Sequence, residues 1–76
     1  MQWTAVYFKP GSNWEDNPMD GTYEGWQVEA VLSEEALRKL EQRSDVPYQT
    51  YLVEILPTSA LLEWETENQV KVEIHS

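Results

Sequence analysis

A single segment of this chain carries a full set of helix signals, and the segments on both sides of it alternate as strands do. Residues 34 to 43 (EEALRKLEQR) follow Ser33, a good N-cap, and begin with two glutamates at the positive end of the helix dipole. Pro47 prevents the helix from continuing. Two pairs have the i,i+4 spacing of helical ion pairs: Glu34 with Arg38, and Glu35 with Lys39. The apolar side chains form a narrow stripe that must lie on a sheet: Ala36, Leu37 and Leu40.

Two strands are expected before the helix. Residues 2 to 9 (QWTAVYFK) are rich in aromatic and β-branched types and stop at Pro10. Both faces of this strand are apolar, so it is either central in a sheet or covered on its second face. Residues 10 to 22 contain two prolines and two glycines and form a long loop. Residues 23 to 32 alternate again and are predicted to form the second strand.

The third strand is expected at residues 48 to 56, and Pro57 ends it. Alternation places three apolar side chains on one of its faces: Tyr51, Val53 and Ile55.

The tail, residues 60 to 74, is interpreted as a hairpin whose register depends on its turn. A two-residue turn would mix the polar and apolar faces, whereas a three-residue turn at residues 67 to 69 pairs Trp64 with Val72. A competing interpretation makes residues 58 to 64 a helical turn after Pro57.

The predicted fold class is therefore α+β: one domain, residues 1 to 76, with an antiparallel sheet of four or five strands. The elements follow the order β-β-α-β-β, and the helix packs on one face of the sheet. A domain of this size buries only about 60% of the surface that its unfolded chain exposes. No cysteine is present to form a disulfide, and the first residues lack the pattern of a signal peptide. We expect a complete, soluble, cytoplasmic protein.

Charge is the strongest signal in the composition. The chain has 14 acidic and 5 basic residues, a formal net charge of -9. Such a charge favours solubility, and it also suits a basic partner, such as the nucleic-acid-binding surface of another protein. Direct binding to nucleic acid or to an anionic membrane is disfavoured, because a phosphate-binding surface needs a cationic patch.

The long loop resembles part of an EF-hand calcium loop. Asp16, Asp20 and Gly21 match the first, fifth and sixth positions of that pattern, but Pro18 occupies the third and Gln27 the twelfth. The EF-hand is therefore excluded, and weak calcium binding by residues 16 to 24 stays an alternative. We prefer a turn whose aromatic residue, Trp14, pins it onto the sheet.

Catalytic and metal chemistry have few candidate residues. His75 is the only histidine and no cysteine is present, so neither a catalytic triad nor the usual zinc ligand set can be assembled. We expect no enzymatic activity, no metal site and no cofactor.

The candidate partner-binding residues are acidic or aromatic. In the expected hairpin register three glutamates share one sheet face, where Glu63 opposes Glu73 and Glu65 opposes Lys71. The aromatic candidates are Trp3, Tyr7 and Trp14, the first two on the sheet face that the helix leaves open.

These features predict a noncatalytic, acidic, protein-binding module. The expected role is inhibition, in which the protein occupies the basic, nucleic-acid-binding surface of a larger partner. In size and charge it resembles the small acidic inhibitors that bacteriophages and other mobile elements encode. The alternatives are a structural or regulatory subunit that docks through the aromatic face, and the weak calcium-dependent module.

Overall fold

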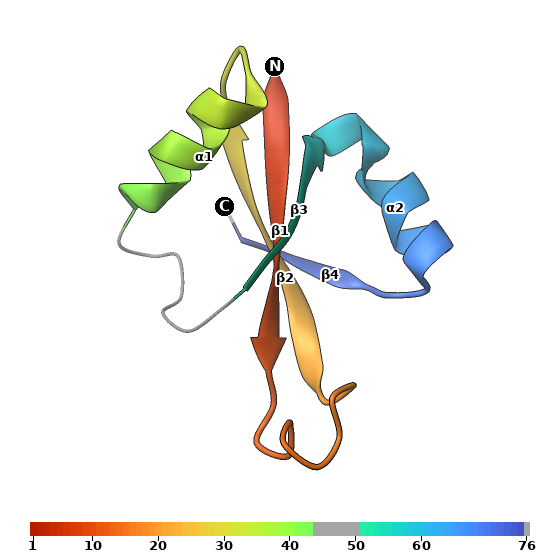
Figure 1. Cartoon of the computed structure of the whole chain (residues 1–76). Coiled ribbons are helices and arrows are strands. Elements are labelled where there is room, and N and C mark those ends of the chain that lie inside the picture. The colour runs from red at the N-terminus through yellow and green to blue at the C-terminus, as the bar shows by residue number, and fades with distance from the viewer. Residues whose placement is uncertain (44–50, 76) are drawn as a thin grey trace.

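The computed structural model describes residues 1–43 and 51–75. Its elements are β1 (Gln2–Pro10), β2 (Gly21–Glu29), α1 (Ser33–Glu41), β3 (Tyr51–Pro57), the 3-10 helix η1 (Thr58–Ala60), α2 (Leu61–Asn68) and β4 (Val72–His75) (Figure 1). The fold is α+β, as the sequence predicted. The part of the predicted third strand before Tyr51, and Pro47, lie outside the described residues. Within the two described ranges, no helix combines the length and apolar character needed to cross a membrane.

The four strands form one mixed sheet in the order β3-β1-β2-β4. β1 is central, which explains why both of its faces are apolar, and it pairs antiparallel with β2 and β3. β4 instead pairs with β2 in parallel. The prediction of an all-antiparallel sheet is therefore wrong at its last strand, because η1 and α2 carry the chain across the sheet from one edge to the other.

The predicted hairpin at residues 60 to 74 is wrong. The competing interpretation, a helical turn at residues 58 to 64, is confirmed for those residues, but the helix is longer and continues to Asn68. Leucine and glutamate favour a helix here, and Leu61 and Trp64, three residues apart, both turn toward the sheet. Consequently Glu63 and Glu65 lie on α2 while Glu73 lies on β4, so the three do not share one sheet face.

A left-handed residue, Gln69, directly follows α2, with φ 55° and ψ 42°. The Val70 amide donates to the Glu65 carbonyl (3.1 Å) and the Gln69 amide to the Thr66 carbonyl (3.3 Å), which is the Schellman arrangement. Glycine normally occupies this position because a Cβ makes the left-handed conformation unfavourable.

We expect Gln69→Gly to stabilise the protein by about 0.5 to 1 kcal/mol, because glycine removes the strain of the left-handed residue. Urea unfolding measures the change. The matched control is Asn68→Gly at the last residue of α2, which should destabilise, because it removes the hydrogen bond from Asn68 Nδ2 to the Trp64 carbonyl (2.9 Å) and glycine is the poorer helix former. If both substitutions changed the free energy of unfolding in the same direction, α2 would not end before Gln69.

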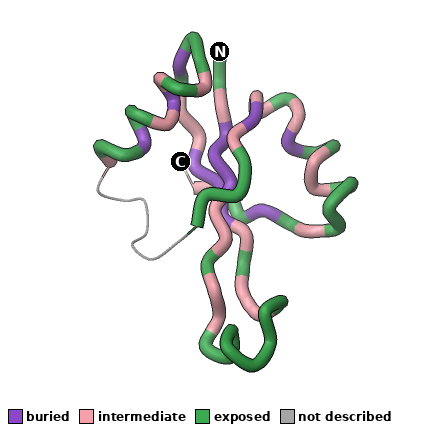
Figure 2. Tube along the Cα trace, in the orientation of Figure 1, coloured by how far each residue is buried: buried purple, intermediate pink, exposed green. Residues whose placement is uncertain are grey.

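The helices cover opposite faces of the sheet, and each closes its own core (Figures 1 and 2). On the α1 side the buried residues are Ala5, Trp26 and Leu40, with Tyr7, Val28 and Ile55 packed against them. On the α2 side they are Val6, Leu56, Leu61 and Val72, with Tyr23, Ala60 and Trp64. The prediction of one helix on one face is therefore incomplete, and the sheet face expected to be open is covered.

The helix α1 lies close to its predicted position but is not capped as expected. It begins at Ser33, so the N-cap is Leu32, and no side chain among the described residues caps it. A cap contributes only about 1 kcal/mol, and burial of Ala36 and Leu40 against the sheet outweighs it. One of the two predicted ion pairs is confirmed, because Lys39 Nζ lies 3.4 Å from Glu35 Oε1.

A β-bulge changes which side chains of β3 share a face. Val6 pairs with Glu54 and Tyr7 with Leu52, which leaves Val53 as an extra residue. Tyr51, Val53 and Ile55 were predicted on one face, but the bulge directs Ile55 to the α1 core. Tyr51 and Val53 line a hollow on the α2 side of the sheet.

Candidate functional site

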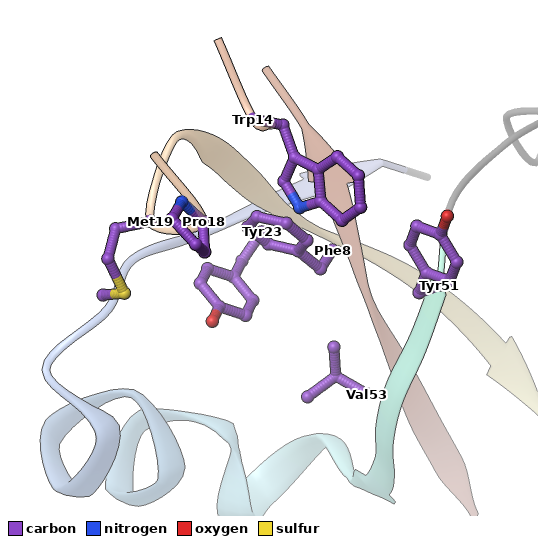
Figure 3. A pocket seen from close by; sticks show the side chains of 7 residues that line it. All are labelled: Phe8, Trp14, Pro18, Met19, Tyr23, Tyr51 and Val53. Carbon is purple, nitrogen blue, oxygen red and sulfur yellow. The ribbon is translucent and has the colours of Figure 1, made fainter. Parts of the chain in front are cut away.

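An apolar hollow lies between the loop of residues 11 to 20 and the sheet, on the side that α2 partly covers (Figure 3). Its volume is about 420 Å³. We call it the aromatic groove, and its lining residues are Phe8, Trp14, Pro18, Met19, Tyr23, Tyr51 and Val53. β1 and β2 form its floor, β3 forms one wall and the loop forms the other.

The walls of the aromatic groove are exposed although they are apolar. Met19 is 85% exposed and Trp14 42%, and Tyr51 and Val53 are also classed as exposed. Side chains so accessible to water contribute little to folding. A contiguous group of them commonly marks a site where another molecule binds.

The loop that carries Trp14 and Met19 is held in one shape by its own hydrogen bonds. The Gly11 amide donates to the Asp20 carbonyl (3.0 Å), and the Asn13 amide to Asp20 Oδ2 (2.9 Å). The Met19 amide donates to Asn17 Oδ1 (3.1 Å). Asp20 therefore accepts hydrogen bonds from the loop backbone, which agrees with the interpretation of this segment as a turn. A loop ordered in this way loses little entropy when it binds.

Gly21 allows the loop to return close to the floor of the groove. Its φ is +155°, a conformation that other residues rarely adopt. A Cβ at this position would clash with the ring of Phe8 and the carbonyl of Lys9. Glycine is therefore required where the loop enters β2.

An acidic hollow adjoins the aromatic groove. Aromatic rings connect the two: Tyr23 contacts Phe8 with ring centroids 5.2 Å apart, and Trp64 with centroids 6.1 Å apart. Trp64 lines the second hollow together with Leu56, Ala60 and three carboxylates, those of Glu54, Glu63 and Glu67. Negative charge therefore lies next to the apolar groove.

Positive charge lies mainly on the other side of the sheet. Three of the five basic residues belong to α1 or follow it directly: Arg38, Lys39 and Arg43. Since α1 covers the opposite face, the side of the sheet with the groove is left predominantly negative.

The structure separates the six predicted partner-binding residues. Trp14 lines the aromatic groove and Glu63 lines the acidic hollow beside it. Glu65 accepts a hydrogen bond from the Val72 amide (2.9 Å), and Trp3 Nε1 donates to the Ala30 carbonyl (3.1 Å). The side chains of Glu65 and Trp3 therefore stabilise the fold through these hydrogen bonds.

Tyr7 packs edge-on against Trp26 in the α1 core, with ring centroids 5.7 Å apart. Burial raises the pKa of Tyr7, and the negative charge of Glu41 adds to the rise, so the phenol stays neutral at physiological pH. It does not lie on an open sheet face.

Glu73 meets two residues that sequence analysis did not connect with it. It pairs in register with Glu24, and one ligand atom each of Glu24, Glu73 and His75 lie within 4.8 Å of one another. The unexpected parallel pairing of β2 with β4 creates this group, and no short-range motif signals it.

Comparisons of the chain with protein-family models, curated proteins and solved structures found no match.

Proposed function

We propose that this protein is a noncatalytic binding module whose aromatic groove receives an apolar side chain from a basic segment of a partner protein. The observation that carries the proposal is the exposure of Trp14 and Met19 on a loop whose backbone is already ordered. Folding alone does not require large apolar side chains at that position. Aromatic and methionine side chains are the types enriched at protein interfaces.

Charge supports a basic partner. The protein carries a net charge of -9, and Glu54, Glu63 and Glu67 lie in the hollow next to the groove. Lysine or arginine residues flanking the apolar anchor would meet these carboxylates. Complementary charge of this kind accelerates association and selects among partners.

Inhibition of a nucleic-acid-binding protein is one consequence of this proposal. If the basic segment belongs to a nucleic-acid-binding surface, occupying it excludes the nucleic acid. The support for this role is the net charge, because the expected array of Glu63, Glu65 and Glu73 on one sheet face does not form.

The test begins with selection of displayed random peptides on the purified full-length chain. The enriched peptides should carry lysine or arginine around one large apolar residue, and their affinity should fall as ionic strength rises. Enriched peptides without basic residues, or binding that is independent of salt, would contradict a basic partner.

Trp14→Ala should weaken binding of the best selected peptide about 30-fold or more, which corresponds to the roughly 2 kcal/mol expected of an aromatic anchor. Fluorescence anisotropy of the labelled peptide measures the dissociation constant. The control is Leu62→Ala, which removes another exposed apolar side chain, on α2 and outside the groove lining. Equal effects of the two substitutions would refute the groove as the binding site.

A further inference from the structure

The strongest unassigned feature is a cluster of potential metal ligands on the α1 side of the sheet, away from the aromatic groove. Glu24 comes from β2, and Glu73 and His75 come from β4. The parallel register pairs Glu24 with Glu73, and Trp26 with His75, so all three ligands project from one face. One ligand atom of each lies within 4.8 Å of the other two.

Glu24 is the buried member of the cluster, and only one of its two carboxylate oxygens has a hydrogen-bond partner among the described residues. The residue is only 7% exposed, and its Oε1 lies 2.8 Å from His75 Nε2. Its Oε2 is buried and has no hydrogen-bond partner in the described part of the chain. A buried carboxylate oxygen without a partner is unfavourable, and a cation bound at this carboxylate would remove that cost.

His75 is held in an orientation suited to a ligand. Its ring stacks on the ring of Trp26, with centroids 4.4 Å apart and an angle of 14° between the planes. Trp26 is itself fixed in the α1 core, where it is 2% exposed. The ring therefore presents Nε2 to the Glu24 carboxylate from a defined position.

We propose that Glu24, Glu73 and His75 bind a Zn²⁺ ion that joins β4 to β2. Imidazole nitrogen together with carboxylate oxygen is a donor set that suits zinc. Two carboxylates and a neutral imidazole carry a charge of about -2, which balances the ion. His75 and Glu73 are accessible to solvent, so water completes the tetrahedral coordination.

The ligands must draw together by about 1 Å to hold the ion. Zinc keeps its nitrogen and oxygen ligands at about 2.0 to 2.2 Å, so in a tetrahedral site two ligand atoms lie about 3.3 to 3.6 Å apart. The cluster spans 4.8 Å, and the exposed side chain of Glu73 is free to close the difference. In the bound state Zn²⁺ replaces the contact between His75 and Glu24.

The test is calorimetric titration of the full-length chain with Zn²⁺ in metal-free buffer, together with thermal unfolding. We expect saturable binding of one ion per chain, a rise in Tm, and slower amide exchange in β4. Glu73→Gln and His75→Gln should each weaken binding by more than the roughly 10- to 100-fold that the loss of an outer-shell partner costs. Neither substitution removes a core side chain, so both variants should fold.

The matched control is Glu63→Gln, which removes the same charge from α2 on the other side of the sheet and should leave zinc affinity unchanged. Three results would overturn the proposal. The first is titration without saturation, the second is unchanged affinity in His75→Gln, and the third is equal weakening by Glu63→Gln, which would indicate diffuse attraction to an acidic protein.

Discussion

Replacing Trp26 by alanine should cost about 3 to 5 kcal/mol of stability, the range for removal of a large aromatic side chain from a packed core. Trp26 is 2% exposed and contacts three parts of the fold: Tyr7 on β1, Leu40 on α1 and His75 on β4. Domains are stable by about 0.05 to 0.15 kcal/mol per residue, or roughly 4 to 11 kcal/mol for a chain of this length. The variant should therefore lose between about a quarter and all of its stability. Urea unfolding followed by circular dichroism measures the loss.

The matched control for this substitution is Trp14→Ala. Trp14 is exposed on the loop, so its removal should cost no more than about 1 kcal/mol. A large loss of stability in Trp14→Ala, or a small one in Trp26→Ala, would contradict the assignment of one tryptophan to the core and the other to the groove.

The two adjacent leucines of α2 should differ sharply. Leu61 is 9% exposed and packs with Val6, Leu56 and Val72, so Leu61→Ala should destabilise by about 2 to 5 kcal/mol. Leu62 is 75% exposed, and Leu62→Ala should change stability by no more than about 0.5 kcal/mol. Thermal unfolding of the two variants gives the comparison.

This pair also distinguishes the helix from the hairpin that the sequence predicted. In the hairpin, Leu62 shares the apolar face with Trp64, and Leu61 points the other way. A larger loss for Leu62→Ala than for Leu61→Ala would therefore restore the hairpin and remove α2 from the fold.

Local patterns predicted the first half of the fold better than the second. The strand at residues 2 to 9, the long loop and the central helix each depend on short-range signals, and all three are present at nearly the predicted bounds. The hairpin predicted for the tail is wrong because that prediction depends only on the alternation of side chains. Alternation fits residues 60 to 74 as a hairpin, yet the spacing of Leu61 and Trp64 fits a helix equally well, and burial against β1 and β3 decides between them.

The candidate sites depend on contacts that sequence spacing does not reveal. The aromatic groove joins Phe8 and Tyr23 of the sheet with Trp14 of the loop, and the bulge at Val53 shapes its wall. The alternation of apolar and polar residues in a sequence does not show where a bulge lies. One extra residue in a strand moves the side chains that follow it to the other face of the sheet. The sequence shows His75 only as a single histidine, because its contact with Glu24 forms through the parallel pairing of β4 with β2.

We propose that a basic partner occupies the aromatic groove. The most direct test of this proposal is amide NMR of the isotopically labelled protein during titration with a peptide selected for binding. We expect shift changes concentrated in residues that line the groove, with residues of α1 unaffected: Phe8, Trp14, Met19, Tyr23 and Tyr51 should shift. Shift changes concentrated on α1, or on Trp26 and His75, with those groove residues unmoved, would contradict it.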